Sequence, residues 1–282
     1  WPADDPEGCA VCGAPLDAGG AHATPLLPPP PAAFPCGVCR RPFKDARALG
    51  QHAQTCGVKR RIRLHYSHGL EAGPDGFKAR SCREWADVTA PDMEMSLLNP
   101  FKRNGLAARL LAWRGDWAAA SRDSLERCAA IQAEALAKGP PPDVLLASSW
   151  GAAVALKLLA DRAWTGPALL LCPGHRKLLG ADDAEALVDA VAALPRKTLR
   201  HVKLLHGAAD AVVPIADSRE LARRARVPLV ELPGGTHGLG AATADGTVAR
   251  EALSVLAARH ERTGAALGGM FFLDGVPRGR DV

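Results

Sequence analysis

The fold is decided by the stretch VLLASSWGAA at residues 144–153, which is followed at once by VALKLL at 154–159. The first part is an apolar run of the kind that forms a buried strand, and the last part repeats apolar residues at helical spacing. Between them the sequence reads small-x-Ser-x-small, which is typical of a strained turn from a strand into a helix. The stretch therefore predicts a strand, a sharp turn that exposes a serine hydroxyl, and a helix.

Packing selects one of the two adjacent serines. The turn is so tight that the residues two before and two after the exposed serine lie against neighbouring backbone, so both must be small. Ala147 and Gly151 meet that condition for Ser149. For Ser148 the same two positions hold the large side chains of a leucine and a tryptophan. Ser149 is the candidate nucleophile, and the alternative is an ordinary strand-to-helix turn that happens to contain serine.

Strand and helix patterns alternate on both sides of this turn. Further strands are expected at 62–67, 88–92, 167–173, 202–207 and 227–232. Helices are expected at 77–85, 121–138, 182–194, 215–226 and 247–260. This alternation predicts an α/β fold with a mostly parallel sheet and helices on both faces. The irregular apolar residues between 93 and 120 fit either a small cap over a cleft or ordinary core.

Two more polar residues follow strand ends. Asp210 comes after the strand at 202–207, and His237 lies in a glycine-rich loop after the strand at 227–232. Ligands of open α/β sheets bind beyond the carboxyl ends of the strands, where Ser149 also lies. A serine hydroxyl needs an imidazole to take its proton, and the imidazole needs a carboxylate to orient it. His68, His175, His206 and His260 are rivals for the base, but none of them sits in such a loop. His68 and His206 are better interpreted as structural residues of their turns.

The segments around these residues resemble the α/β-hydrolase superfamily. HGAADAVVP at 206–214 is similar to the family's acid turn, and GTHG at 235–238 is similar to its histidine loop. The resemblance covers residues 61 to about 260 and is closest to small serine esterase-like members. One departure is that Ala147 stands where the family usually has glycine. The resemblance implies the α/β-hydrolase fold.

The same resemblance implies roles for particular residues. It gives Ser149 as nucleophile, Asp210 as orienting acid and His237 as base. The family builds its oxyanion hole from a loop after an early strand and from the residue after the nucleophile, which here gives the backbone N–H groups of Leu70 and Trp150. Such donors stabilise the negative oxygen that forms during acyl transfer.

A second motif lies near the start of the chain, where five of the eight cysteines fall. The spacing C-x2-C-x3-F-x5-L-x2-H-x3-C predicts a tetrahedral zinc site formed by Cys36, Cys39, His52 and Cys56. The first two would sit on a hairpin turn and the last two on one helix face. The pattern resembles a ββα zinc finger of the C2H2 type, with cysteine in place of the last histidine (a C2HC variant). Cys9 and Cys12 leave a second metal site open.

The expected role of this finger is structural or protein-binding. At the helix positions that face bases in related fingers, Gln51 is the one good base reader, so DNA recognition is the weaker expectation. The basic run from Lys59 to Arg63 fits phosphate contacts, although a solvated edge of the next domain is preferred.

The domain organisation follows from these patterns. We expect a Pro/Gly-rich, largely unstructured segment at 1–35, the finger at 36–58, the α/β-hydrolase domain at 61–262 and a C-terminal tail at 263–282. The 282 residues carry a net charge of +5, which is too weak to indicate nucleic acid by itself. No apolar run reaches membrane-spanning length, so we expect a soluble, cytoplasmic protein, with the nucleus as the alternative location.

The functional expectation is a serine hydrolase (EC 3.1) that cleaves a small-molecule carboxylic ester or thioester through an acyl-enzyme. Zn2+ is expected as a structural ion of the finger, and no cofactor is expected for catalysis. The alternative is a zinc-finger regulator that binds nucleic acid or protein and whose hydrolase fold is not catalytic.

Overall fold

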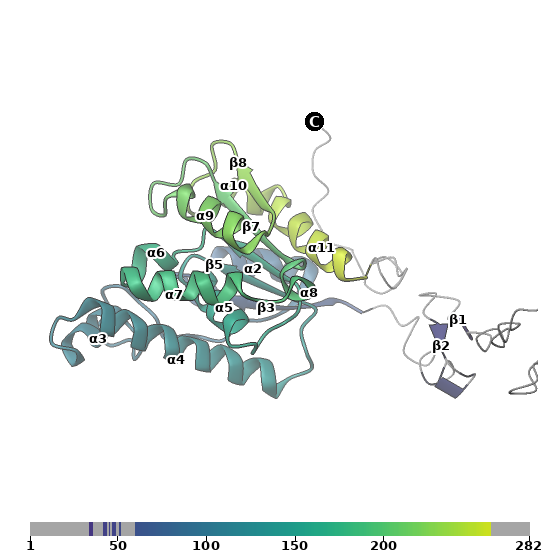
Figure 1. Cartoon of the computed structure of the whole chain (residues 1–282), viewed down its shortest axis with the longest axis horizontal. Helices are drawn as coiled ribbons and strands as arrows, with labels where there is room; N and C mark the ends of the chain where they lie inside the picture. The colour runs from purple at the N-terminus through teal and green to yellow at the C-terminus, as the bar shows by residue number, and fades with distance from the viewer. Residues whose placement is uncertain are drawn as a thin grey trace, which may run out of the picture.

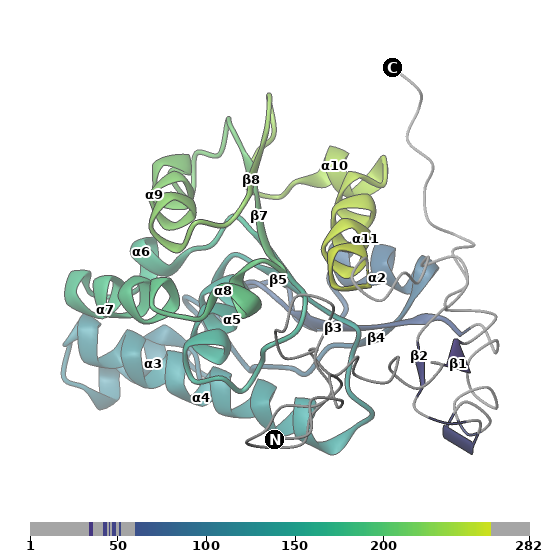
Figure 2. The same cartoon turned by 45° about the vertical axis from the view of Figure 1, so that its right-hand side comes forward.

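The computed structural model describes residues 60–260 and a few residues before them, namely Phe34–Pro35, Pro42–Phe43, Asp45, Arg47–Ala48 and Gln51. Residues 60–260 form a six-stranded parallel sheet in the order β4-β3-β5-β6-β7-β8 (Figures 1 and 2). The strands are β3 (Ile62–Ser67), β4 (Ala86–Thr89), β5 (Val144–Ser148), β6 (Ala168–Leu171), β7 (Val202–Gly207) and β8 (Leu229–Leu232).

Helices cover both faces of this sheet. On the face that carries the central helix they are α3 (Leu106–Ala112), α4 (Trp117–Lys138), α5 (Trp150–Ala160), α6 (His175–Leu178), α7 (Ala181–Ala192) and α9 (Ile215–Ala225). On the other face they are α2 (Phe77–Trp85), α10 (Gly240–Ala244) and α11 (Thr247–His260). The short helix α8 (Arg196–Leu199) leads into β7.

The winding of the chain explains this division. From β3 the chain steps outward to β4, and then crosses β3 to continue through β5, β6, β7 and β8. Because parallel crossovers are right-handed, reversing the direction of travel moves the connecting helix to the opposite face. The helix α2 therefore lies on one face, and the helices that link the later strands lie on the other. The reversal creates a switch point between the carboxyl ends of β3 and β5, where open sheets place their ligands.

Alternation along the central strand divides the core in two. Leu145 and Ala147 belong to the apolar cluster beneath α4, α5 and α7, whereas Val144 and Leu146 belong to the cluster beneath α2 and α11. All four side chains are almost fully buried. A strand that is covered on both faces needs apolar residues at every position, which is why this run lacks a polar alternation.

The expected elements are confirmed, with shifted ends. The helix expected at 121–138 begins at Trp117, because the Asp116 carboxylate accepts a hydrogen bond from Ala119 N–H at 3.0 Å and caps it. The strand expected at 88–92 occupies Ala86–Thr89 instead, in register with β3. The expected α/β class and mostly parallel sheet are therefore present.

The segment between 93 and 120 is neither wholly core nor wholly exposed. Met93 and Met95 are buried in the cluster beneath α4 and α5. Leu98 and Phe101 are 79% and 92% exposed, so their apolar character does not reflect core packing. An irregular apolar pattern cannot distinguish these two outcomes, because both place large apolar residues without helical or strand periodicity.

The described residues near the start of the chain include one strand pair. β1 (Phe34–Pro35) and β2 (Pro42–Phe43) are antiparallel and flank the first two cysteines of the predicted finger. The expected ligands Cys36, Cys39, His52 and Cys56 lie outside the described residues, so the zinc site stays a prediction. No helix within the described ranges is both long and apolar enough to cross a bilayer.

Several histidines are buried in this fold. Burial lowers the pKa of His65, and it lowers the pKa of His175 to about 4, helped by the charge of Arg176. The His175 side chain has no exposed surface. A base with a lowered pKa in the folded state binds protons more readily when the chain unfolds.

We therefore predict that acid destabilises the protein through His175. Neutral His175 makes its full contribution to the free energy of unfolding above pH 6.5, which is near the pKa of histidine in the unfolded chain. As the pH falls from there toward 4, this contribution is lost, by about 3 kcal/mol in total. The measurement is the free energy of urea unfolding between pH 7 and pH 4. The slope against pH is expected to be shallower in His175→Gln than in wild type, whereas the exposed control Arg80→Gln keeps the wild-type slope. Equal slopes for His175→Gln and wild type would contradict the prediction.

Candidate active site

Ser149 occupies the turn between β5 and α5 with a strained backbone. Its φ is 58° and its ψ is −116°, a region that residues other than glycine rarely adopt. The turn is held by hydrogen bonds on both sides, since Ser149 N–H donates to Leu171 O at 2.8 Å and Gly174 N–H donates to Ser149 O at 3.1 Å. The strand, sharp turn and helix expected from the sequence are confirmed.

Gly151 makes this tight turn sterically feasible. A Cβ at this position would lie 2.1 Å from Ser67 O and 2.4 Å from His68 O, far inside van der Waals contact. The start of α5 can therefore approach the end of β3 only if residue 151 is glycine. This close approach is the physical reason for the small residue after the serine.

The three candidate catalytic side chains meet at one edge of the sheet. Ser149 Oγ lies 2.9 Å from His237 Nε2, and His237 Nδ1 lies 2.7 Å from Asp210 Oδ2. The carboxylate only accepts hydrogen bonds, so Nδ1 carries the proton and Nε2 is left to accept from the serine hydroxyl. The Asp210 side chain is fully buried, and that of His237 is 22% exposed. The imidazole therefore bridges a buried charge and an accessible hydroxyl.

Asp210 is held in its ionised form. Burial alone raises the pKa of this carboxyl, but hydrogen bonds from Val213 N–H and His237 outweigh it, so the pKa lies below its usual range. Oδ1 accepts from Val212 N–H at 2.8 Å and from Val213 N–H at 2.9 Å, which leaves Oδ2 for the histidine. Both donors lie in the turn that follows β7. This turn therefore orients the Asp210 side chain and favours its ionised form.

A second histidine contacts the same carboxylate. His206 Nε2 lies 3.1 Å from Val213 O and 3.2 Å from Asp210 Oδ2, and its Nδ1 lies 2.7 Å from Ser218 Oγ. Because the Val213 carbonyl can only accept, Nε2 carries the hydrogen and Nδ1 accepts from the Ser218 hydroxyl. Burial lowers the pKa of His206, which keeps this ring neutral. The sequence indicated a structural role for His206, but nothing in the pattern identified Ser218 as its partner.

The loop after β3 lies directly beside the nucleophile. A Cβ on Gly69 would lie 3.3 Å from Ser149 Cβ. His68 anchors the loop, because its Nδ1 donates to Gly69 O at 2.8 Å and its Nε2 accepts from Met93 N–H at 3.1 Å. Burial lowers the pKa of His68, so the neutral form with this pair of contacts is favoured. His68 therefore holds the loop in place through both ring nitrogens, and it is not a rival base.

The two expected oxyanion donors come from this loop and from the start of α5. Within residues 60–260, neither Leu70 N–H nor Trp150 N–H donates to a backbone carbonyl. The next residue of the loop, Glu71, accepts from Ser96 Oγ at 3.0 Å and from Leu97 N–H at 2.7 Å. The segment that follows β4 thus holds the loop through Glu71. The Leu70 N–H group remains without a backbone acceptor among the described residues.

A cavity of about 510 Å³ opens beside the serine and the histidine. Its walls come from the end of β3, the following loop, the first turn of α2 and the turns after β5, β7 and β8. The apolar side chains that line it are those of Leu70, Ala72, Phe77 and Val212. No residue between 93 and 120 lines it, so this segment is not a cap over the cavity.

One group of side chains in the described part of the chain has the spacing of metal ligands. Donor atoms of Cys172, His206 and Asp210 lie within 4.8 Å of one another. However, both His206 nitrogens already make hydrogen bonds, and burial raises the pKa of the Cys172 thiol to about 12. A protonated thiol and a ring without a free nitrogen do not suit a metal ion. The group is better explained as support for the acid.

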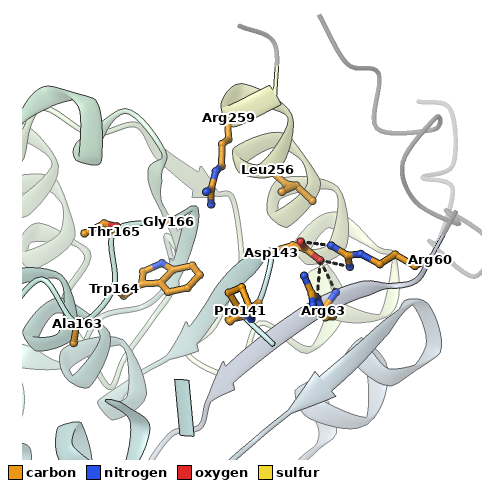
Figure 3. A pocket seen from close by; sticks show the side chains of 11 residues that line it. Arg60, Arg63, Pro141, Asp143, Ala163, Trp164, Thr165, Gly166, Leu256 and Arg259 are labelled. Carbon is orange, nitrogen blue, oxygen red and sulfur yellow. Dashed lines mark hydrogen bonds and ion pairs between the residues drawn. The ribbon is translucent and has the colours of Figure 1, made fainter. Parts of the chain in front are cut away.

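The basic run before β3 lies at the other end of the sheet, beside a cavity of about 460 Å³ (Figure 3). Arg60 makes two contacts of 2.6 Å with the Asp143 carboxylate, and Arg63 N–H donates to the same group at 2.8 Å. Arg61 Nε lies 3.0 Å from Asp87 Oδ1. These arginines pair with carboxylates at the starts of strands, which agrees with the preferred interpretation as the edge of a domain.

The turn at Ser149 gives a direct stability prediction. Gly151→Ala is expected to lower the free energy of unfolding by about 3 kcal/mol or more, because the new methyl group meets two backbone carbonyls that cannot move independently. Gly139→Ala is the matched control, since nothing lies within 4 Å of a Cβ at that position, and it should change stability little. The measurement is urea unfolding of both variants. A Gly151→Ala variant as stable as Gly139→Ala is incompatible with the close approach described above.

Comparisons with known proteins give similarities at the level of fold. No protein-family model matches the chain, and no curated protein matches its sequence. A candidate hydrolase of the alpha/beta superfamily from Xanthomonas campestris pv. campestris is 23% identical, with 72% of this chain and 98% of that chain covered and a TM-score of 0.43. TT1662 from Thermus thermophilus is 18% identical, with 74% and 91% covered and a TM-score of 0.49. Est1E from Butyrivibrio proteoclasticus is 16% identical, with 71% and 89% covered and a TM-score of 0.45. At these values no activity is transferred to this chain, and its function is inferred from the geometry of its own site.

Proposed function

We propose that the chain is a serine hydrolase that cleaves a carboxylic ester or thioester through an acyl-enzyme. The observation that carries the proposal is the continuous hydrogen-bonded series Ser149, His237 and Asp210 beside an accessible cavity. A nucleophile, a base within hydrogen-bond reach and a third group that orients the base are the signature of an activated serine. The strained turn supports the same proposal, because strain persists at functional positions where the surroundings enforce it.

The first chemical step follows from the proton positions. His237 Nε2 takes the proton of the Ser149 hydroxyl as its oxygen attacks the carbonyl carbon of the substrate. The imidazolium that forms is stabilised by the ionised Asp210 carboxylate, 2.7 Å from Nδ1. Leu70 N–H and Trp150 N–H stabilise the negative oxygen of the tetrahedral intermediate.

The remaining steps release the leaving group and then the acid. The imidazolium gives its proton to the leaving alcohol or thiol as the bond to the acyl carbon breaks, which leaves the acyl group on Ser149. Water then attacks this ester, with His237 again as the base, and releases the acid. The apolar walls of the cavity favour a substrate with a hydrocarbon portion.

The experiment is covalent labelling with a fluorophosphonate probe, combined with hydrolysis of p-nitrophenyl esters of graded chain length. We expect wild type to label, and we expect Ser149→Ala to lose labelling and at least about 10⁴-fold in kcat. Ser148→Ala is the matched control, because it removes the adjacent hydroxyl from the same stretch and should still label.

The contrary result is well-folded wild-type protein that neither labels nor hydrolyses any of the esters. Salt-sensitive nucleic-acid binding by such a protein would favour the other class, a zinc-finger regulator with a non-catalytic hydrolase fold. Equal loss of labelling in both serine variants would also count against Ser149 as the single nucleophile.

We also propose that the finger carries one structural Zn2+, held by Cys36, Cys39, His52 and Cys56. Support comes from the ligand spacing alone, because two C-x-x-C thiolates and a helix-borne His-x-x-x-Cys pair can close a tetrahedral site. The accessory module would contact a protein more readily than DNA, since one finger covers only about three base pairs.

The zinc proposal predicts metal content. Purified full-length protein is expected to contain one Zn2+ per chain by elemental analysis, and Cys36→Ser is expected to lose most of it. Cys82→Ala, which removes a buried thiol of the main domain, should retain it. Zinc that is unchanged in Cys36→Ser would rule out this ligand set.

A further inference from the structure

The cavity beside Ser149 contains one lysine among largely apolar walls. Lys78 lines it together with Phe77, Leu70 and Val212, and with the serine and histidine of the site. The side chain comes from the first turn of α2, which begins at Phe77. Lys78 and Cys82 are four residues apart, so Lys78 lies on the helix face that also carries the buried Cys82.

The position is unfavourable for a cation in the absence of a ligand. A positive charge in the first turn of a helix opposes the helix dipole, and α2 has no acidic residue there that would compensate. Lys78 is half-buried, and this burial lowers the pKa of its ammonium group. The nearby thiols of Cys82 and Cys172 do not neutralise it, because burial raises the pKa of each to about 12.

Lys78 also lacks an acidic partner. Within the described residues it makes no ion pair, and no hydrogen bond from its ammonium group is present. Glu71 is the one carboxylate among the residues that line this cavity, and it is engaged by Ser96 Oγ and Leu97 N–H. A half-buried ammonium that makes no ion pair is costly, and a bound anion would reduce that cost.

We propose that Lys78 binds a carboxylate of the substrate, so that the natural substrate is an ester or thioester that carries one acid group, such as a half-ester of a dicarboxylic acid. The inference rests on the proposed hydrolase function and specifies its substrate class. A single ammonium matches the single charge of a carboxylate, whereas a phosphate dianion is usually met by several donors or by an arginine fork. The apolar walls would hold the hydrocarbon spacer between the acid group and the scissile carbonyl.

The test uses substrates of equal length with and without the acid group. The p-nitrophenyl half-esters of glutaric and adipic acid are compared with the p-nitrophenyl esters of pentanoic and hexanoic acid. For each pair the measured quantity is the ratio of kcat/KM for the acidic ester to kcat/KM for the neutral one. We expect Lys78→Met to lower this ratio at least about tenfold for the preferred length, as loss of a hydrogen bond to a charged group does.

Two further variants separate charge from shape. Lys78→Gln keeps a polar end without charge and is expected to lower the ratio as Lys78→Met does. Arg80→Met removes a positive charge from the exposed side of the same helix and is expected to keep the wild-type ratio, which excludes general attraction by the protein surface. The loss in the Lys78 variants should appear mainly in KM, because the contact exists before and during the reaction.

The outcomes distinguish the two proposals. If fluorophosphonate labels Ser149 but the ratio is the same in wild type and in Lys78→Met for both lengths, the role of Lys78 is wrong and the hydrolase function stands. If wild type neither labels nor cleaves any of the four esters, the hydrolase function fails and the inference fails with it. Glutarate that protects Ser149 from labelling in wild type, but not in Lys78→Met, would support the inference independently of turnover.

Discussion

The site depends on one steric constraint, which is the contact between the start of α5 and the end of β3. The backbone at Gly151 approaches two carbonyl oxygens so closely that no side chain fits between them. Ser149, two residues before Gly151 in the same tight turn, has a strained backbone conformation that costs roughly 1–3 kcal/mol. The parallel pairing of β5 with β3 and β6, and the burial of every side chain of β5, offset that cost.

At the same edge of the sheet, a set of hydrogen bonds stabilises the charge of Asp210. Asp210 accepts hydrogen bonds from two backbone N–H groups, from His237 and from the neutral His206, so the fold itself stabilises its negative charge. Preorganisation of this kind lowers the reorganisation needed during reaction. Ser218 completes the arrangement, because its hydroxyl donates to His206 Nδ1, the nitrogen that carries no hydrogen when Nε2 donates to Val213 O. His206 and Ser218 are as buried as core residues, although both are polar.

Much of this arrangement is readable from the sequence, because it is encoded in short local patterns. The strand, turn and helix around Ser149 are defined by side-chain size within ten residues, and the order of Ser149, Asp210 and His237 follows from the strand ends. The contact of Ser218 with His206 and the position of Lys78 are set by how helices pack on the sheet, so no local pattern reports them. For the same reason the sequence could not decide whether residues 93–120 form a cap or part of the core. Apolar side chains of this segment lie both inside and outside the core. The zinc site stays a prediction, because its four ligands lie outside the described residues.

The buried thiols have a consequence for reactivity toward oxidants. Cys82, Cys128 and Cys172 are all buried and unpaired, and burial raises the pKa of each thiol to between about 11 and about 12. The thiolate is the form that peroxides and alkylating reagents attack, so these three sulfurs stay inert at neutral pH even though Cys172 lies beside the acid. Within residues 60–260, peroxide or iodoacetamide is therefore expected to leave these three cysteines unmodified while the protein is folded.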